Sequence, residues 1–139
     1  MNILLVGTGG VGEAIAVMAC RRPWLDKMVL ADYNLARVRE VQARLGDERR
    51  FPVEQVDAAD RAQVEALARR HGADLVLNAC DPRFNLPILD AALSAGCHYL
   101  DMALSLSCPH PEDPYRRPGI KLGDLQFEKA AEWERRGLL

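Results

Sequence analysis

Short apolar runs alternate with longer stretches of helical periodicity, and this alternation limits the fold of the chain more than any other feature. Five runs have the length of strands: Asn2–Val6, Met28–Ala31, Val53–Val56, Leu75–Leu77 and Tyr99–Leu100. Between them, apolar side chains recur about one helical turn apart in residues 10–21, 35–45, 61–71 and 86–95. Strands and helices in this order predict a parallel sheet with helices on both faces.

The composition of the runs predicts the order of the strands. Ile3–Val6 and Leu75–Leu77 are apolar throughout, as expected of central strands that are buried on both faces. Val53–Val56 contains Glu54 and Gln55, which favours the edge of the sheet. We therefore predict an α/β fold of the Rossmann type, a doubly wound parallel sheet with the order 3-2-1-4-5.

Residues at the helix boundaries support this division. Asn34 and Asp60 are good N-terminal caps, and Asp60 followed by Gln63 resembles a capping box. We expect Asn85 to cap the fourth helix. Glycines that favour helix ends follow three of the helices, at Gly46, Gly72 and Gly96.

The part of the chain after Leu100 has a different character. Residues 104–122 contain four prolines, which predicts a Pro-rich loop rather than a helix or a central strand. We expect one C-terminal helix, capped by Asp124 and running to Arg136, and then the start of another strand at Leu138–Leu139. These features predict one domain over residues 1–139 that is a fragment of a longer protein. Its exposed apolar edge motivates the hypothesis of a homodimer.

The glycine motif between the first strand and the first helix carries the chemistry. It reads Gly7-Thr8-Gly9-Gly10-Val11-Gly12, a G-x-G-x-x-G pattern. Gly7 permits a tight turn, Gly9 lets a pyrophosphate approach the backbone, and Gly12 lets the helix pack against the sheet. The free N–H groups at the helix start then face the phosphates. We predict that residues 7–12 bind a dinucleotide.

Asp32 lies 20 residues after Gly12, at the predicted end of the second strand. A carboxylate at this position accepts hydrogen bonds from the adenosine ribose and repels a 2′-phosphate, which favours NAD over NADP. Arg37 and Arg39 follow on the next helix and leave NADP open as a cofactor. We interpret both arginines as part of a solvated helix face.

Other strand ends are expected to line the same site, because ligands of such sheets bind outside the carboxyl ends of the strands. Asp57 and Ala58 end the third strand and are predicted to flank the adenine. Asn78, Ala79 and Cys80 end the fourth strand, beside the predicted ribose and pyrophosphate. We interpret Cys80 as a small buried residue rather than a nucleophile. On the fifth strand, Asp101 is a weak candidate for a catalytic group, and the catalytic residues are otherwise unknown.

Composition narrows the classes of function. The chain has 139 residues, of which 49% are hydrophobic and 27% charged, as in one globular domain. A net charge of -2 gives no reason to expect nucleic acid as a partner. No apolar run approaches the ~18–20 residues of a membrane span, and the N-terminus does not have the form of a signal peptide. We expect a soluble cytoplasmic protein with no membrane partner.

The four cysteines and three histidines give no metal motif. No two cysteines form a C-x-x-C pair, and the histidines lack the spacing of metal ligands. We predict no metal site and free thiols in a reducing compartment.

Several segments resemble the saccharopine dehydrogenase family. Four of them are MNILLVGTGGVGEAIA, ADYNLARV, LVLNACDPRFNLPILDAAL and AGCHYLDMA. The tail, with its specific segment DPYRRPGIKLGDLQF, resembles a particular branch of saccharopine dehydrogenases and lysine dehydrogenase-like enzymes. The chain is thus similar to the N-terminal NAD(P)-binding domain of this family.

The resemblance implies an NAD(P)-dependent oxidoreductase that acts on a C–N bond of a small amino-acid-type substrate. Relatives form or cleave saccharopine, dehydrogenate lysine or form polyamines. Gly7, Gly9, Gly12 and Asp32 match the dinucleotide pattern of the family, and Tyr99–Asp101 matches its nicotinamide side. Family members carry a second α/β domain, so we expect no turnover from this chain alone.

Two other classes share the glycine motif. Regulatory domains of potassium transport systems bind NAD(H) or another nucleotide to switch a partner and catalyse nothing. The Pro-rich segment and the GCHYLD motif argue against this alternative. Flavin-binding Rossmann domains usually have Glu where this chain has Asp32.

Overall fold

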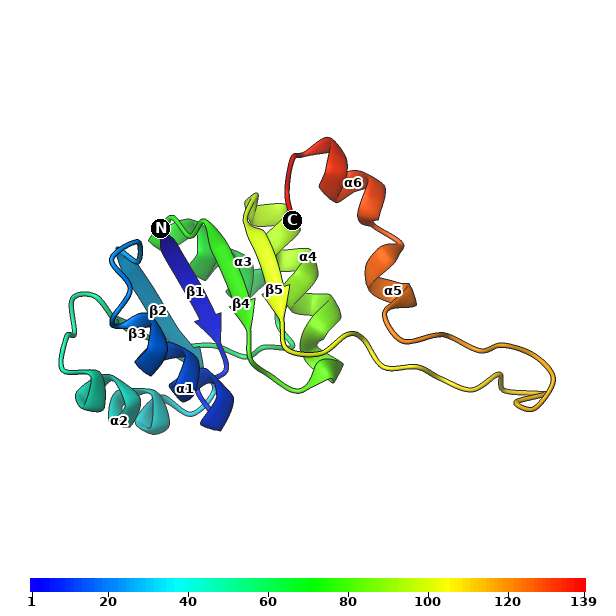
Figure 1. Cartoon of the computed structure of the whole chain (residues 1–139), viewed down its shortest axis with the longest axis horizontal. Helices are drawn as coiled ribbons and strands as arrows, with labels where there is room; N and C mark the ends of the chain where they lie inside the picture. The colour runs from blue at the N-terminus through cyan, green and yellow to red at the C-terminus, as the bar shows by residue number, and fades with distance from the viewer.

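A five-stranded parallel sheet with the order β3-β2-β1-β4-β5 forms the centre of the computed structural model, which describes residues 1–139 (Figure 1). Leu4 at the middle of β1 is aligned with Val29 of β2 and with Val76 of β4. The predicted fold class and strand order are both confirmed. The strands are β1 Asn2–Val6, β2 Lys27–Asp32, β3 Val53–Gln55, β4 Leu75–Asn78 and β5 His98–Asp101.

Two helices cover each face of the sheet. Helices α1 (Gly10–Ala19) and α2 (Leu35–Leu45) lie on one face, and α3 (Arg61–His71) and α4 (Asn85–Ala95) lie on the other. The side chains of β1 alternate between the two cores: Ile3 and Leu5 pack with α1 and α2, whereas Leu4 and Val6 pack with α3 and α4. Because β1 is buried on both faces, it holds the loop that follows it in a fixed place.

The predicted helix boundaries hold at most positions. The Asn34 side chain accepts a hydrogen bond from the Arg37 N–H, and Asp60 accepts from two N–H groups at the start of α3. The glycines at the ends of α2, α3 and α4 are all left-handed, with φ of 73°, 57° and 79°.

The prediction that Asn85 caps the fourth helix is wrong. A short 3-10 helix, η1 (Pro82–Phe84), precedes α4, and Asn85 is the first residue of α4 itself. Its side chain donates to the Ala103 carbonyl and accepts from Asn78. These contacts to distant residues have displaced the local capping bond.

The expected single C-terminal helix is divided in two. Helix α5 (Asp124–Phe127) and helix α6 (Ala130–Arg135) are separated by a break at Glu128 and Lys129. At the break, Lys129 pairs with Asp90 of α4, and Trp133 of α6 is buried beside Tyr99 with ring centroids 6.3 Å apart. Asp124 is not the cap but the first helical residue, because Gly123 precedes it with φ of 86°.

The expected strand at Leu138–Leu139 is not formed. The Leu139 carbonyl nevertheless accepts a hydrogen bond of 2.7 Å from the Tyr99 N–H, on the free edge of β5.

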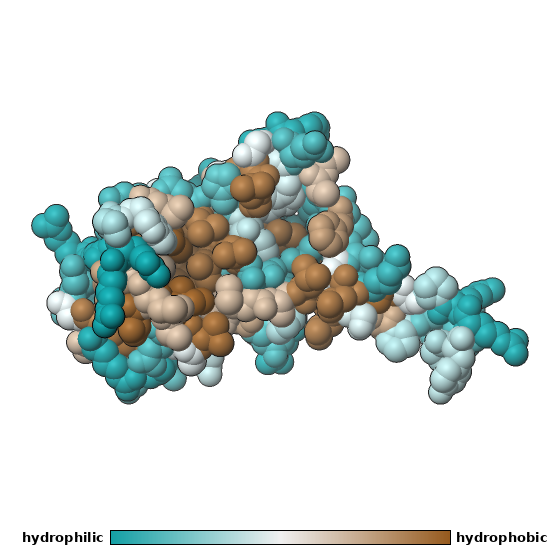
Figure 2. Space-filling model, in the orientation of Figure 1, coloured by the Kyte–Doolittle hydropathy of each residue, from teal (hydrophilic) through white to brown (hydrophobic).

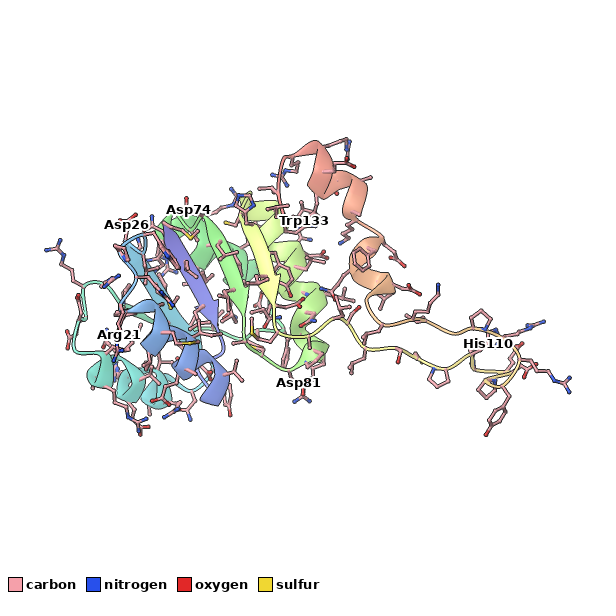
Figure 3. The ribbon with its side chains drawn as sticks, viewed as in Figure 1. Arg21, Asp26, Asp74, Asp81, His110 and Trp133 are labelled. Atoms are coloured by element: carbon pink, nitrogen blue, oxygen red, sulfur yellow. The ribbon has the colours of Figure 1, made fainter.

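The Pro-rich segment forms an arm, residues 103–122, that extends away from the sheet (Figure 1). Its two sides meet at one antiparallel bridge between Cys108 and Ile120. His110 lies near its tip (Figure 3). Hydrophobic residues gather over the base of the arm (Figure 2), where Leu104, Leu106 and Leu122 are exposed. The prediction of a Pro-rich loop is therefore confirmed. The part of the arm nearest the sheet is apolar.

Candidate functional site

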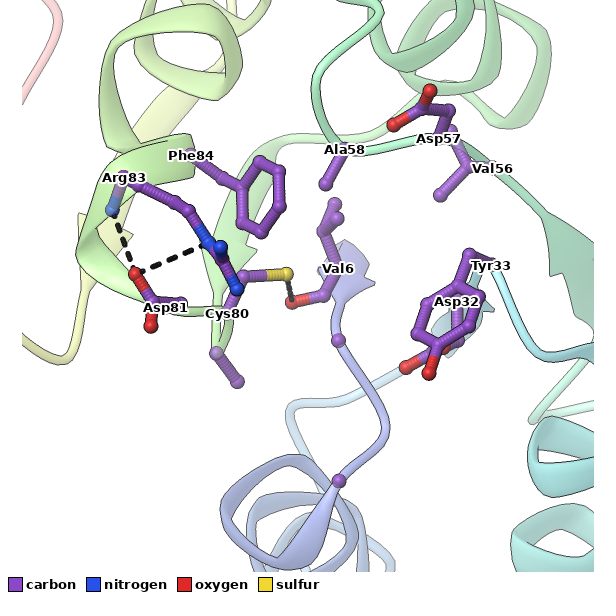
Figure 4. Close-up of a pocket in the computed structure, with 13 residues that line it drawn as sticks. Val6, Asp32, Tyr33, Val56, Asp57, Ala58, Cys80, Asp81, Arg83 and Phe84 are labelled. Atoms are coloured by element: carbon purple, nitrogen blue, oxygen red, sulfur yellow. Dashed lines mark hydrogen bonds and ion pairs between the residues drawn. The ribbon is translucent and has the colours of Figure 1, made fainter.

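A cleft of about 630 Å³ opens at the carboxyl edge of the sheet, where four strands end (Figure 4). Tyr33 and Asp32 form one side, whereas Cys80 and Phe84 lie on the other. Asp81 lies at this carboxyl edge of the sheet, and Asp26 and Asp74 lie at the opposite edge (Figure 3). The cleft is lined by Val6, Gly7, Gly9, Asp32, Tyr33, Val56, Asp57, Ala58, Ala79, Cys80, Asp81, Arg83 and Phe84.

The turn from β1 into α1 requires glycine at its first and last positions. Gly7 has φ of +94°, and a Cβ there would lie 2.8 Å from Cys80 Sγ. A Cβ at Gly12 would lie 1.9 Å from the Gly7 carbonyl oxygen. A side chain at Gly12 would push α1 away from the turn, and one at Gly7 would collide with Ala79 and Cys80 after β4, so both glycines serve the packing of the turn.

Gly9 and Gly10 differ, because a Cβ at either position would meet no protein atom within 4 Å. The packing of the chain therefore does not require glycine at these positions. Gly9 lines the cleft and is also the N-cap of α1, without a side-chain hydrogen bond. The first N–H groups of α1 thus lack the side-chain cap that α2 and α3 possess. We call the open space beside Gly9 and Gly10 the cradle. An uncapped helix N-terminus beside this cradle fits the pyrophosphate of a dinucleotide.

Asp32 is positioned by three hydrogen bonds at the end of β2. Its Oδ2 accepts from the Thr8 N–H at 2.7 Å and from the Thr8 hydroxyl at 3.2 Å. Its Oδ1 accepts from the Asn34 N–H at 3.0 Å. A carboxylate has about four acceptor directions, which leaves one for a ligand hydroxyl.

The interpretation of Arg37 as part of a solvated helix face is wrong. Its Nε donates to the Thr8 carbonyl at 3.3 Å, and its guanidinium pairs with Glu13 of α1. Arg39, by contrast, is exposed. Helical periodicity did not reveal these contacts, because they join α2 to the glycine loop and to α1, which are distant in sequence.

Buried groups beneath the cleft connect three elements. The Asn78 side chain donates to Asn85 Oδ1 at 2.8 Å and to the Tyr99 hydroxyl at 3.1 Å, and it accepts from the Cys80 N–H. Burial raises the pKa of Tyr99 far above its ordinary value. Asn78 is fully buried and does not line the cleft, so its contacts position Cys80 and the start of α4.

Cys80 lines the cleft as a protonated thiol. Burial, with smaller contributions from the carboxylates of Asp32 and Asp81, raises the pKa of Cys80 to about 11. Its Sγ donates to the Val6 carbonyl at 3.4 Å. No histidine lines the cleft, so no base is in place to activate this thiol.

The structure brings together seven of the predicted site residues. The cleft is lined by Gly7, Gly9, Asp32, Asp57, Ala58, Ala79 and Cys80. Thr8 and Asn78 are buried behind it, and Gly10, Val11 and Gly12 lie in the first turn of α1. Asp101 lies elsewhere. It accepts from Gln126 at 2.7 Å and lines an apolar groove of about 580 Å³ between β5 and the last two helices.

Sequence reasoning placed the loop of residues 81–84 beside the ribose and pyrophosphate but did not select the aromatic walls of the cleft, Tyr33 and Phe84, as site residues. Tyr33 directly follows Asp32, and Phe84 belongs to η1, a short turn that periodicity does not detect. The guanidinium of Arg83 lies 5.1 Å from the Phe84 ring and pairs with Asp81 at 3.6 Å. The available signals were that Tyr33 directly follows the end of β2 and that Phe84 belongs to the loop between β4 and α4.

Comparison with known proteins identifies the family. The model of the saccharopine dehydrogenase NADP binding domain matches residues 3–139. The chain belongs to the saccharopine dehydrogenase family. The predicted resemblance is thereby confirmed, and this chain is an NAD(P)-binding domain of the family. The alternative of a regulatory nucleotide sensor gains no support.

Curated relatives in this family are enzymes. The chain is 31% identical over 102 residues to the carboxyaminopropylagmatine dehydrogenase of Synechocystis, covering 73% of this chain and 25% of the relative. It is 30% identical over 114 residues to the carboxynorspermidine synthase of Vibrio cholerae, covering 76% and 28%. The chain thus spans about a quarter of the length of these two relatives.

Among solved structures, GenD2 from gentamicin A biosynthesis, crystallised with NAD, superposes on the whole chain and on 33% of its own length. The TM-score is 0.67 at 20% identity, which shows a shared fold. In this saccharopine dehydrogenase-family domain, every helix is too short or too polar to span a bilayer.

Proposed function

We propose that the cleft binds NAD and that the chain is the cofactor-binding domain of an oxidoreductase acting on a C–N bond. One observation carries the proposal: an open cradle at Gly9 and the Asp32 carboxylate border the same cleft. These are the two contacts that the pyrophosphate and the adenosine ribose require. The family model and the dehydrogenase and synthase relatives support it.

The residues of the chain have separate roles in this proposal. The N–H groups at the start of α1 hold the pyrophosphate, and the free acceptor direction of Asp32 receives a ribose hydroxyl. Asp57 and Ala58 flank the adenine, and Ala79 and Cys80 form the wall beside the ribose and pyrophosphate. The bound dinucleotide supplies hydride transfer, and the chain orients it.

The names of the relatives support an amino-acid-type substrate. Both names describe carboxylated amines. We therefore propose a small substrate whose C–N bond is formed or oxidised, as inferred from the family resemblance. Asp101 is our candidate on the substrate side.

Calorimetric titration of the chain with NADH and NADPH tests the cofactor site. We expect NADH to bind more tightly, and Asp32→Ala to weaken NADH binding by about 10-fold or more, because a charge-assisted hydrogen bond contributes about 1.5–3 kcal/mol. Asp74→Ala is the matched control, since Asp74 also accepts a backbone N–H, from Asn2, but at the opposite edge of the sheet. Tighter binding of NADPH would contradict the role of Asp32, and absence of binding would contradict the cofactor site.

A further inference from the structure

The Arg37 guanidinium lies against the glycine loop but is held by a carboxylate from another helix. Arg37 donates to the Thr8 carbonyl and forms an ion pair with Glu13, the fourth residue of α1. Arg44 pairs with the second carboxylate oxygen of Glu13. The side chains of Glu13 and Arg37 are only 20% and 28% exposed, so water screens their attraction less than on an open surface. Glu13 therefore fixes α1 to α2 beside the loop.

Thr8 connects this ion pair to the carboxylate of Asp32. Asp32 accepts from the N–H and hydroxyl of Thr8, and Arg37 donates to the carbonyl of the same residue. In this fold the carboxylate at the end of the second strand contacts the adenosine ribose, and a nearby arginine accommodates a 2′-phosphate in NADP-binding members. Arg37 thus contacts the residue that holds the Asp32 carboxylate, but its charge is already paired with Glu13 and, at 3.5 Å, with Glu40.

We propose that Glu13 determines the preference for NAD over NADP by holding Arg37 in this ion pair. The inference rests on the proposed function, because it requires a dinucleotide in the cleft. Two carboxylates then exclude the 2′-phosphate in different ways: Asp32 repels it, and Glu13 withholds the cation that would attract it.

The ionisation of Glu13 agrees with this role. Hydrogen bonds from Arg44 and Arg37 hold the pKa of Glu13 below its ordinary value. The carboxylate therefore stays charged at neutral pH, and the pair stays formed.

Glu13→Gln tests the proposal, because it keeps the shape of the side chain and removes its charge. In calorimetric titrations with NADH and NADPH, we expect the Kd for NADPH to fall about 10-fold. Arg37 then keeps only its longer pair with the exposed Glu40, at 3.5 Å, and can turn toward a 2′-phosphate. The Kd for NADH should change less than about 2-fold, because its ribose carries no 2′-phosphate. Glu65→Gln is the matched control: Glu65 pairs with Arg69 within α3, is 27% exposed and does not line the cleft.

Arg37→Gln gives an independent test that does not depend on the folding of Glu13→Gln. Since the proposal holds that Arg37 is withheld in the wild-type chain, this variant should leave the ratio of the two Kd values unchanged. The double variant, Glu13→Gln with Arg37→Gln, should lose the gain in NADPH affinity. Circular dichroism establishes that each variant is folded.

Two results would overturn the proposal. One is an unchanged ratio of Kd values in folded Glu13→Gln. The other is a selective loss of NADPH affinity in Arg37→Gln, which would show that the guanidinium already serves the phosphate. Failure of the proposed function is distinguishable, because the wild-type chain would then bind neither dinucleotide.

Discussion

At the scale of single residues, the glycines of one motif perform two different tasks. Gly7 and Gly12 are required by the protein itself, since added Cβ atoms would collide with Cys80 and with the Gly7 carbonyl. Gly9 borders open space in the cleft. The sequence pattern shows the same residue type at each position, and only the structure separates packing from binding.

This separation predicts opposite outcomes for two substitutions. Gly12→Ala should lower the free energy of unfolding by about 3 kcal/mol, because its methyl group overpacks the turn. Gly9→Ala should change it by less than about 0.5 kcal/mol, since φ of -65° suits alanine and the space is open. The Gly9 variant should instead weaken NADH binding about 10-fold by blocking close approach of the pyrophosphate.

Urea denaturation and calorimetric titration of the two variants check these expectations. A Gly9→Ala variant that binds NADH like the wild type would mean that the pyrophosphate does not lie at this cradle. A fully stable Gly12→Ala variant would contradict the tight contact between α1 and the Gly7 carbonyl.

Cys80 should be unreactive at neutral pH despite lining the cleft. With a pKa of about 11, about one thiol in a thousand is ionised at pH 8, so alkylation by iodoacetamide should be far slower than at exposed Cys108. The folded thiol retains its proton to a higher pH than the unfolded one, whose pKa is near 9.0. The free energy of unfolding should therefore decline between pH 9 and about 11.

Mass spectrometry of alkylated peptides measures this reactivity. Equal rates at Cys80 and Cys108 at pH 8 would show that the Cys80 thiol is not buried against the Val6 carbonyl. Cys80→Ser should remove its part of the stability loss above pH 9.

At the scale of secondary structure elements, the buried amide of Asn78 fastens β4 to α4 and β5. Asn78→Ala should lower the free energy of unfolding by about 3 kcal/mol, because it leaves the Cys80 N–H and Asn85 Oδ1 without this partner. Tyr99→Phe is the matched comparison and should cost about 1 kcal/mol, since it removes one hydroxyl only. Denaturant unfolding measures both, and equal losses would contradict the central place of Asn78.

The elements also show how far sequence reasoning reaches. Local signals predicted the strands and the caps at Asn34 and Asp60, because period, capping and glycine conformation depend on neighbours in sequence. Local signals failed at Asn85 and in the last helix, where contacts with Ala103, Asn78 and Asp90 decide the outcome. The cleft followed from strand ends, whereas the Glu13–Arg37 pair and the Phe84 wall depend on packing between elements.

At the scale of the whole molecule, the arm and the edge of β5 expose apolar surface on one side. Leu106 and Phe127 are 58% and 65% exposed, and Phe127 lines the apolar groove together with Leu104 and Trp133. Because apolar patches of this kind favour association, the homodimer stays our prediction. Light scattering at high concentration should give twice the chain mass, and Phe127→Lys should shift it toward the monomer. A wild-type monomer at every concentration would contradict it.

The central claim is that a dinucleotide occupies the cleft at the carboxyl edge of the sheet. Titration of NADH into the ¹⁵N-labelled chain, followed by two-dimensional NMR, tests it most directly. We predict that the amide signals of Gly9, Gly10, Tyr33 and Cys80 shift while those of the arm stay in place. Shifts confined to the groove beside β5, or none at millimolar NADH, would contradict the claim.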